Sequence, residues 1–384
     1  MMIAHVISSC GPGGAEVFVK TLILHATKNK PQLKFQLWVM TRISDVYPTN
    51  IAALEFESRY ISQLTSEGID IKFINKKPNQ NRISTLRKIH LLYAQERPEI
   101  IHAHSEEIAF YISVALWFEK CKIIHSIHSV HIRLTNIHRF LLKYRMSAYV
   151  AISEGVMETV FKSFRLDKNK LFVIYNDIDL ERYYNDAFKV RDKVTRIVAI
   201  GRLTAAKNYP NLFQAVKTIN QQLAVRNIKL PVFVIVGEGE LREQLETLID
   251  RSGLSNVKLL GLRTNIPAQL KYSDIYVMAS NWEGLSISLI EALASGIPIV
   301  ATDVGSNREI IQDRLSGTLV SPSKPERLAN AIIELIESRD LRMSYSQNRK
   351  GQLKRFDLDE CISRHFALYA NYVGENKSKR ADIT

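Results

Sequence analysis

The sequence predicts an α/β protein built on doubly wound parallel sheets, and three observations support this fold class. Short apolar runs rich in Val and Ile recur along the 384 residues and alternate with segments of helical periodicity. Two of these runs, at 2–8 and 196–200, lead into glycine-containing loops. A third region, 274–302, contains a strand, a loop, a helix and another strand in turn. Regular alternation of strands and helices is typical of parallel sheets that carry helices on both faces.

The first half of the chain contains seven segments that we expect to be strands. They are residues 2–8, 33–41, 69–74, 99–104, 122–128, 148–152 and 171–175. After the first of them, Gly13 and Gly14 allow a phosphate to approach the backbone where a helix begins. This turn does not match G-x-G-x-x-G, and no acidic residue ends the second strand. A nicotinamide-dependent oxidoreductase is therefore not indicated.

The second half contains five expected strands and ends in helical sequence. The strands are residues 196–200, 232–237, 257–261, 274–279 and 297–301. Before the last strand, Ser288 and Glu291 fit a capping box, and Gly296 fits the position that follows a helix end. We expect an N-terminal domain at residues 1–180, a linker at 181–194 and a C-terminal domain at 195–356. A helix at 357–373 would then cross back to the first domain, and 374–384 would be a flexible tail.

The composition is that of a soluble globular protein with a basic surface. The three cysteines lie far apart in the sequence, which indicates neither a disulfide framework nor a thiolate metal site. No run reaches the roughly 18 apolar residues of a membrane span, and the apolar start lacks the basic residues of a signal peptide. The net charge is +13, and residues 71–95 and 120–153 contain cations but no acid. Nucleic acid, an anionic membrane surface or a phosphorylated acceptor are the partners that such segments suit.

Charged residues follow two of the expected strands in the second half. Arg202 and Lys207 lie in one loop, and together they suit the diphosphate leaving group of a glycosyl phosphate. Glu283 and Glu291 lie in and after another such loop, eight positions apart. In parallel α/β sheets, the loop that leaves a strand and opens a helix is where ligands bind.

Histidines follow two expected strands in the first half, and a D-x-D sequence ends that half. His104 and His128 are the candidates for acid-base chemistry or sugar contact. A metal site is not expected, because the histidines lack an H-E-x-x-H pattern or supporting acids. The D-x-D at Asp177 and Asp179 is interpreted as the domain boundary rather than as a metal site.

Several of these motifs together resemble one enzyme family. E-G-L-S at 283–286, Glu291 with Ala292, and A-S-G-I-P-I-V-A at 294–301 resemble the signature of family 4 retaining glycosyltransferases of the GT-B fold. G-R-L-x3-K-N at 201–208 is similar to a second family motif, and the turn at 13–16 to a third. Asp177 stands where the family usually has Gly, and 305–309 departs from the usual G-G-x-P/x-E.

The resemblance implies two Rossmann-like domains that face a central cleft, with a nucleotide-sugar held mainly by the second. Arg202 and Lys207 would bind the diphosphate, Glu283 the sugar hydroxyls and Glu291 the ribose diol. His128 would contact the sugar near the reacting centre, with His104 as the second choice. The remaining donor contacts implied are Gly14, Leu262 and Gly284.

The expected function is that of a retaining glycosyltransferase, either a hexosyl- or an N-acetylhexosaminyltransferase. It would move a sugar from an NDP-sugar, expected to be a UDP-sugar, to a saccharide acceptor on a lipid carrier, without a metal cofactor. The setting would be bacterial surface polysaccharide synthesis, such as lipopolysaccharide or capsule. Two alternatives remain open: a non-hydrolysing NDP-sugar epimerase and a basic nucleic-acid-binding protein. No nucleic-acid motif accompanies the basic segments, so nucleic acid is not the expected partner.

A lipid-linked acceptor implies a peripheral enzyme on the cytoplasmic face of the inner membrane. The basic segment 120–153 is the expected membrane contact. Within it, an amphipathic face would present cations to headgroups while its leucines enter the bilayer, and its members are Arg139, Leu141, Leu142, Lys143 and Arg145.

Overall fold

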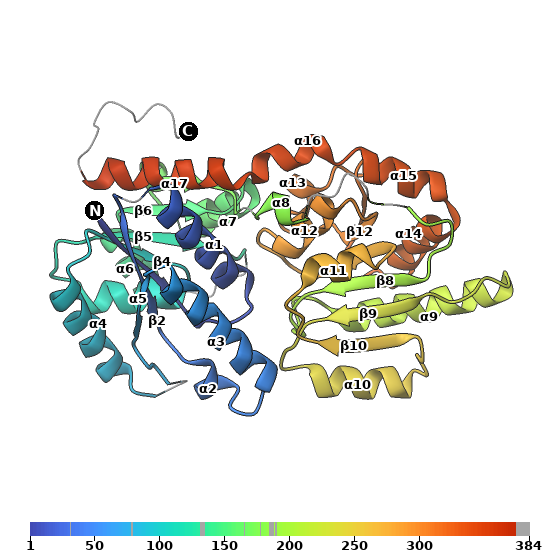
Figure 1. The fold of residues 1–384 in the computed structure, drawn as a ribbon, viewed down its shortest axis with the longest axis horizontal. Helices are drawn as coiled ribbons and strands as arrows, with labels where there is room; N and C mark the ends of the chain where they lie inside the picture. The colour runs from blue at the N-terminus through green and yellow to red at the C-terminus, as the bar shows by residue number, and fades with distance from the viewer. Residues whose placement is uncertain are drawn as a thin grey trace. The chain divides into compact units, whose positions relative to one another are not determined.

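The computed structural model contains two compact units, each with one parallel sheet (Figure 1). The first unit is Met1–Asn176 with Leu358–Thr384, and the second is Asp177–Asp357. The structure describes all residues except 31, 78–79, 131–134, 165, 177, 184–187, 189 and 374–384, and the side chains of 163–164. The predicted doubly wound α/β class is confirmed for both units.

The sheet of the first unit has seven parallel strands in the order β3-β2-β1-β4-β5-β6-β7. The strands are β1 Met2–Ile7, β2 Lys34–Val39, β3 Asp70–Phe73, β4 Ile100–Ala103, β5 Lys122–Ile127, β6 Ala148–Ala151 and β7 Leu171–Val173. The helices are α1 Gly14–Asn29, α2 Ile43–Val46, α3 Ile51–Ser66, α4 Arg82–Glu96, α5 Glu106–Ala115, α6 Asn136–Arg145, α7 Glu154–Phe164, the 3₁₀ turn η1 Lys168–Lys170 and α17 Leu358–Val373. All seven strands lie where the apolar runs predict them.

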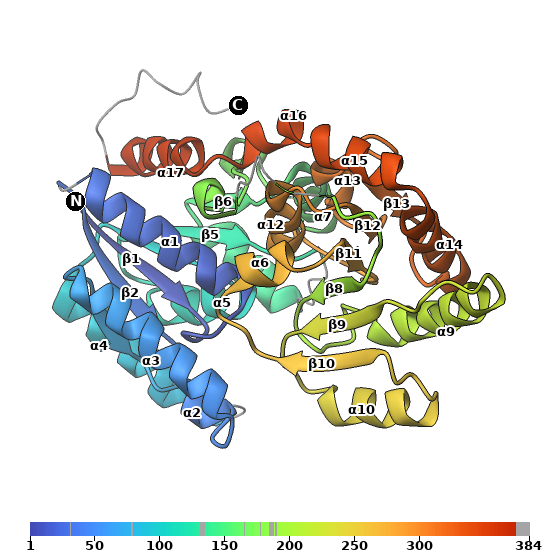
Figure 2. The same cartoon turned by 45° about the vertical axis from the view of Figure 1, so that its right-hand side comes forward.

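Local sequence explains where these helices begin. Asn50, Ser105 and Thr135 precede α3, α5 and α6, and each side chain accepts a hydrogen bond from a backbone amide of the first turn. α17 packs on α1 across the first unit, as both views show (Figure 2). Its buried face includes Leu368 and Tyr369, which belong to the same apolar core as the strands. The last helix of the chain is thus part of the first unit.

The sheet of the second unit has six parallel strands in the order β10-β9-β8-β11-β12-β13. The strands are β8 Arg196–Ile200, β9 Val232–Val236, β10 Val257–Gly261, β11 Ile275–Met278, β12 Ile299–Thr302 and β13 Thr318–Val320. The helices are α8 Leu180–Tyr183, α9 Tyr209–Val225, α10 Arg242–Arg251, α11 Ile266–Lys271, α12 Ile287–Ser295, α13 Asn307–Ile310, α14 Pro325–Glu337, α15 Arg339–Gln347, α16 Lys350–Leu353 and the 3₁₀ turn η2 Lys354–Phe356. We did not predict β13, because its only apolar residues, Leu319 and Val320, lie between polar ones, whereas the equally short β7 lies in the continuous apolar run 171–175.

The direction of strand addition reverses once in each sheet. In the first unit this switch lies between β1 and β4, and in the second it lies between β8 and β11. Ligands of open α/β sheets bind at the carboxyl ends of the strands that flank such a switch. Gly14 begins the helix that follows β1, His104 lies in the loop after β4, and the loops after β8 and β11 contain Arg202 and Glu283. The topology therefore places the candidate residues at the expected edge of each sheet.

The core of each unit is continuous and apolar. Strand residues such as Ile3 and Val300 are fully buried, as expected for strands covered by helices on both faces. Across the residues that the structure describes, no helix combines the length and apolarity needed to cross a membrane.

Candidate functional site

Two loops of the second unit are joined at the switch between β8 and β11. Asn281, in the loop after β11, donates from its backbone amide to Ala206 O at 2.7 Å, and its side-chain oxygen accepts from the Asn208 amide at 2.7 Å. Ser323, which follows β13, also donates to this oxygen at 3.0 Å. One amide side chain therefore holds three loops of the sheet edge in register.

Glycine is required where these loops approach one another. Gly305 has φ +53°, and a Cβ there would lie 2.0 Å from the carbonyl oxygen of Glu283. Gly237 has φ +149°, and a Cβ would lie 2.1 Å from the carbonyl oxygen of Gly201. Backbone atoms cannot move aside as side chains can, so both contacts exclude any larger residue. The close packing of these loops explains the glycine of the unusual 305–309 segment.

Lys207 and Glu283 form an ion pair between the two loops. The Lys207 Nζ lies 2.5 Å from the Glu283 carboxylate, and the side chains are 17% and 12% exposed. The Ser280 hydroxyl donates to the same carboxylate oxygen at 2.5 Å. The structure therefore brings together two residues that the sequence analysis assigned to different parts of the donor.

Arg202 lies in the same loop but is exposed. Among the described residues, no carboxylate forms an ion pair with its guanidinium. A fixed loop that carries one unneutralised guanidinium and one nearby ammonium is suited to binding a multiply charged anion.

Glu291 is buried in α12 and binds a residue that the sequence analysis did not consider. The Tyr183 hydroxyl, from α8, donates to Glu291 Oε1 at 2.5 Å. Burial raises the pKa of Glu291 to about 7. The predicted capping box is wrong: α12 begins after Ser286, and Ser288 lies inside the helix, where its hydroxyl accepts from the Tyr276 hydroxyl at 3.0 Å. Gly296 does end the helix, in the left-handed conformation with φ +80°.

The two remaining candidates of the second unit contribute backbone groups. Gly284 accepts a hydrogen bond at its carbonyl from the Ser306 amide at 3.1 Å, which ties its loop to the segment after β12. Leu262 follows β10, two strands away from β8, and its carbonyl accepts from the Arg263 guanidinium at 3.1 Å. Both lie at the carboxyl edge of the sheet.

In the first unit, Gly14 is the first residue of α1. Gly13 precedes it in an extended conformation, and the Val17 amide donates to the Gly13 carbonyl at 2.9 Å. The Glu16 carboxylate folds back over this turn, because a Cβ on Gly13 would lie 2.1 Å from Glu16 Oε2. A carboxylate therefore already occupies the position at the helix start where a phosphate could approach.

His128 and His104 are linked in a chain of hydrogen-bonded imidazoles. The Asn176 amide donates to His128 Nδ1 at 3.2 Å, and His128 Nε2 lies 3.2 Å from His104 Nδ1. His104 Nε2 in turn lies 2.9 Å from His5 Nδ1. With Asn176 as donor, the pattern is satisfied when each histidine carries its proton on Nε2. Burial lowers the pKa of His128 to about 3, so this ring is neutral at physiological pH.

The burial of the two candidates distinguishes them. His104 is 4% exposed, whereas His128 is only partly buried and lies beyond the end of β5. Both nitrogens of His128 already have protein partners, so a sugar contact through its ring would replace one of them. The structure thus leaves His128 as the more accessible of the pair.

Three buried histidines lie close enough together to be considered as metal ligands. Ring nitrogens of His5, His102 and His104 fall within 4.8 Å of one another. His102 is already hydrogen-bonded to the Tyr369 hydroxyl at 2.7 Å and to the Ser126 hydroxyl at 2.8 Å. Every ring nitrogen of the cluster except His5 Nε2 has a hydrogen-bond partner, and among the described residues no carboxylate joins the cluster. The absence of a metal requirement stays a prediction.

The D-x-D sequence is only partly described. Asp177 lies outside the described residues. Asp179 is exposed and accepts from the Arg182 amide at 3.3 Å, which places it at the start of α8. This role needs no metal.

The expected membrane face on α6 is wrong in two of its members. Leu142 is buried in the first unit rather than directed outward. Arg145 is held by backbone carbonyls of Leu116, Glu119 and Cys121. The exposed apolar residues of α6 are instead Ile137, Phe140 and Tyr144.

Sequence reasoning missed Asn281, Tyr183 and Asn176. Asn281 lies two positions before the E-G-L-S motif, and its place just after a strand could have indicated a bridging role. Asn176 was interpreted only as part of a domain boundary. Tyr183 lies more than a hundred positions from Glu291, and no local pattern could connect them.

Two family models match consecutive parts of the chain. One, described as Glycosyltransferase Family 4, matches residues 12–182. The other, described as Glycosyl transferases group 1, matches residues 184–352. Together they cover both units.

Curated relatives include two bacterial transferases. The chain is 25% identical over 315 residues to the UDP-Gal:alpha-D-GlcNAc-diphosphoundecaprenol alpha-1,3-galactosyltransferase of Escherichia coli, covering 76% of this chain and 80% of the relative. It is 31% identical over 210 residues to the N-acetylgalactosamine-N,N'-diacetylbacillosaminyl-diphospho-undecaprenol 4-alpha-N-acetylgalactosaminyltransferase of Campylobacter jejuni, covering 53% of this chain and 55% of the relative. The second alignment thus spans about half of each protein.

Solved structures share the fold over nearly the whole chain. Anabaena Alr3699/HepE in complex with UDP and glucose aligns with a TM-score of 0.78 and 20% identity, covering 96% of this chain and 99% of that one. A glycosyltransferase from Rickettsia africae aligns with a TM-score of 0.76 and 17% identity, covering 98% and 99%.

Proposed function

The chain belongs to the family 4 glycosyltransferases of the GT-B fold, and from this premise we propose that it transfers a sugar from a UDP-sugar to a lipid-diphosphate-linked saccharide with retention of anomeric configuration. The observation that carries the proposal is the set of charged groups at the β8/β11 switch. Arg202, Lys207 and Glu283 lie in two loops that Asn281 joins, beside the start of α12.

These groups suit the departing end of a nucleotide-sugar. A diphosphate develops negative charge as its bond to the sugar breaks, and preorganised cations stabilise that charge most in the transition state. Arg202 is available for this role, and Lys207 enters it by sharing its ammonium between Glu283 and a phosphate oxygen. The Glu283 carboxylate then accepts from sugar hydroxyls, and the Glu291 carboxylate from the ribose diol. Leu262 and Gly284 supply backbone groups to the donor, and Gly14 contributes from the first unit.

Retention follows if both bonds change on one face of the sugar. The bond between the anomeric carbon and the phosphate oxygen breaks, and the acceptor hydroxyl oxygen bonds to that carbon from the same side. The acceptor proton passes to the departing diphosphate, which is the base. His128 is neutral at physiological pH, so it acts in this scheme as a neutral hydrogen-bonding group beside the sugar. No metal is required, because Arg202 and Lys207 supply the positive charge.

The acceptor class is proposed from the relatives. The named Escherichia coli and Campylobacter jejuni enzymes both have substrates that end in a diphosphate-linked undecaprenol. The Escherichia coli enzyme's name also specifies a UDP-sugar, and HepE has been crystallised with UDP. A lipid-linked acceptor further implies that the protein works at an anionic membrane surface in bacterial surface polysaccharide synthesis.

Donor and acceptor can be tested in sequence. UDP-, GDP- and ADP-sugars are first compared for thermal stabilisation of the protein, and we expect a UDP-sugar to give the largest shift. That donor is then offered with a panel of lipid-diphosphate saccharides, and the anomeric configuration of the product is read by NMR. An inverted product would contradict retention. Conversion of the donor sugar without any acceptor would instead support an epimerase.

A further inference from the structure

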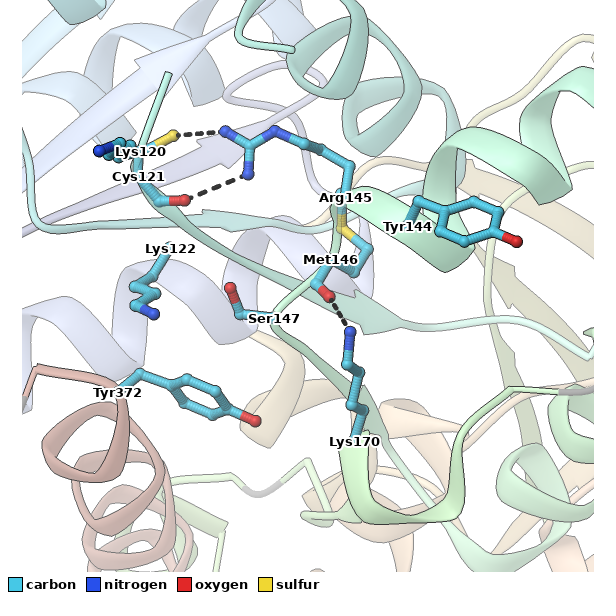
Figure 3. Close-up of a pocket in the computed structure, with 9 residues that line it drawn as sticks. All are labelled: Lys120, Cys121, Lys122, Tyr144, Arg145, Met146, Ser147, Lys170 and Tyr372. Carbon is cyan, nitrogen blue, oxygen red and sulfur yellow. Dashed lines mark hydrogen bonds between the residues drawn. The ribbon is translucent and has the colours of Figure 1, made fainter. Parts of the chain in front are cut away.

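A pocket opens at the amino edge of the first unit's sheet (Figure 3). His128 and Gly14 lie at the opposite, carboxyl edge of this sheet. The volume of the pocket is about 530 Å³. The lining residues lie at or just before the first residues of β5, β6 and β7, and are Lys120, Cys121, Lys122, Tyr144, Arg145, Met146, Ser147 and Lys170, with Tyr372 from α17. The proposed transfer chemistry uses none of them.

The pocket is strongly cationic. Lys120, Lys122, Arg145 and Lys170 line it, and no acidic residue does. Arg145 is fixed by Leu116 O at 2.8 Å and Cys121 O at 3.2 Å, so most of its donors are occupied, and no carboxylate among the described residues forms an ion pair with it. Arg145 thus sets a positive potential without being a direct ligand.

The three lysines are the groups that can contact an anion. Lys120 and Lys122 are exposed, and Lys170 uses one of its three N–H groups to reach Met146 O at 3.1 Å. Within the described part of the chain, none of the three forms an ion pair. Figure 3 shows Lys122, Ser147, Tyr372 and Lys170 around a common space. Ser147 accepts from the Ile123 amide at 3.3 Å, which leaves its own proton to donate. Several such donors around one space suit a phosphate group.

An aromatic rim continues from this pocket along α6. Tyr144 lines the pocket and packs on Phe140 with ring centres 4.7 Å apart, and Phe140 stacks on Trp117 at 6.3 Å. Tyr144 and Phe140 are 63% and 54% exposed, and the adjacent Phe118 is 95% exposed. Scattered exposed apolar residues are ordinary on soluble proteins, but contiguous aromatic rings beside a cationic pocket are not.

The geometry of α6 extends this rim across the unit. Ile137, Phe140 and Tyr144 are spaced at i, i+3 and i+7, so they share one face of the helix. The helix begins after β5 ends and finishes before β6 begins, so its exposed face runs from the carboxyl edge of the sheet to the amino edge. The exposed cations Arg139 and Lys143 flank this face.

We propose that the pocket and the α6 face together dock the first unit on an anionic phospholipid bilayer. A headgroup phosphate enters the pocket and is held by Lys120, Lys122 and Lys170. The aromatic rings of Phe140, Tyr144 and Phe118 enter the interfacial region, which suits amphipathic and aromatic side chains. The proposal rests on the proposed function only in giving a reason for the enzyme to bind a membrane.

Vesicle flotation with the full chain tests the proposal. Wild type should float with phosphatidylcholine vesicles that contain phosphatidylglycerol, and should stay in solution with phosphatidylcholine alone. A lysine near an anionic surface contributes about fivefold to binding, so K120Q/K122Q/K170Q should bind roughly a hundredfold more weakly. The matched control K217Q/K229Q/K271Q removes three exposed lysines of the second unit and should bind as wild type does. Equal losses of vesicle binding in the two triple variants would contradict a specific role of the pocket lysines.

The aromatic rim has its own variant and control. F140S/Y144S should weaken binding at high salt, where the cations are screened, whereas Tyr272→Ser, at a 60% exposed tyrosine of the second unit, should not. Wild-type binding by F140S/Y144S would overturn the role of the rim.

Two further measurements test whether the pocket binds another anionic ligand and whether it takes part in donor binding. Inorganic phosphate should release wild type from vesicles more effectively than sodium chloride of equal ionic strength. Stabilisation by phosphate without vesicle binding, or pocket-dependent binding of an oligonucleotide without vesicle binding, would overturn the bilayer proposal. K120Q/K122Q/K170Q should keep wild-type stabilisation by the UDP-sugar, because the pocket lies at the opposite edge of the first sheet from His128 and Gly14. Loss of that stabilisation would show instead that the pocket serves donor binding, and it would overturn the assignment.

Discussion

At the carboxyl edge of the first sheet neutral imidazoles form a hydrogen-bonded chain, whereas at the carboxyl edge of the second a lysine and a glutamate form an ion pair. All ten histidines of the chain lie in the first unit, and residues 177–357 contain none. His5, His104 and His128 form a hydrogen-bonded chain, while Lys207 and Glu283 form an ion pair. A neutral chain can face uncharged sugar hydroxyls without an electrostatic cost. Fixed ions are needed where a diphosphate departs. The contrast therefore fits the proposed function, in which the second unit binds most of the donor and the first the acceptor.

The contrast also gives the two units opposite responses to pH. Burial lowers the pKa of His5, His125 and His128 to about 3, below the usual 6.5 that each regains on unfolding. Their contribution to stability is therefore complete above about pH 6.5 and declines as the pH falls. Burial raises the pKa of Glu291 to about 7, above its usual 4.5. Its contribution is complete below about pH 4.5 and declines as the pH rises.

The largest expected effect is acid destabilisation of the first unit. Each buried neutral histidine should cost about 1.4 kcal/mol of unfolding free energy per pH unit below about 6.5. Hydrogen exchange at about pH 7 and about pH 5.5, corrected for intrinsic rates, should show loss of protection in β1, β4 and β5. Peptides of the second unit, which has no histidine, are the internal reference. Equal loss in both units would break the comparison.

The buried His125 provides a variant for this effect. Among the described residues, neither of its ring nitrogens has a hydrogen-bond partner. His125→Leu should therefore flatten the pH dependence by about one proton, and an unchanged slope would contradict its lowered pKa.

The next largest effect concerns the ion pair of the second unit. Lys207→Ala should lower both activity and stability, because it leaves the mostly buried Glu283 carboxylate without its cation, at a cost of about 3 kcal/mol. The double variant K207A/E283Q should recover thermal stability but not activity. If Lys207→Ala unfolds at the wild-type temperature, the pair is not a structural feature of the free enzyme.

Arg202→Ala should separate chemistry from folding. The exposed guanidinium makes no ion pair among the described residues, so the unfolding temperature should not change. Loss of one preorganised charge should raise the activation free energy by about 2 to 4 kcal/mol, which lowers kcat/KM roughly 30- to 1,000-fold. Lys217→Ala, at an exposed site on α9, is the control. Near-normal turnover by Arg202→Ala would remove this residue from the diphosphate site.

A smaller effect is expected between about pH 4.5 and about pH 7. Over this range the unfolded chain has lost the Glu291 proton while the folded protein keeps it, so this carboxyl lowers stability as the pH rises. Glu291→Gln keeps an oxygen that can accept from Tyr183 and should remove this contribution, so stability should rise more steeply with pH over this range than it does in the wild type. An unchanged slope in this variant would contradict the raised pKa.

No effect is expected from metal removal. In the proposed mechanism Arg202 and Lys207 supply the charge that a divalent cation would otherwise provide, so EDTA should leave turnover unchanged. Complete loss with EDTA that Mn²⁺ or Mg²⁺ restores would implicate Asp177 and Asp179.

The sequence by itself determined the strands and the fold class, and it supplied the members of the proposed donor site. Short Val- and Ile-rich runs between helical segments are a local signal, and all but the three-residue β13 were found from them. Arg202, Lys207, Glu283 and Glu291 were also found locally, because each follows a strand within a recognisable motif. Local signals of this kind depend on neighbours within a few positions, which a sequence displays directly.

Only the tertiary structure decided which of these residues touch. The Lys207–Glu283 pair and the Tyr183–Glu291 hydrogen bond join residues 76 and 108 positions apart. The chain from Asn176 to His5 joins four strands, because its members lie after β7, β5 and β4 and within β1. The charged pocket likewise collects the amino ends of three strands and the end of α17. Such contacts arise from the order of strands in a sheet and from packing between helices, and no periodicity within one segment encodes them. For the same reason the sequence could identify α6 as basic and apolar, but not that Leu142 faces the core while Phe140 faces solvent.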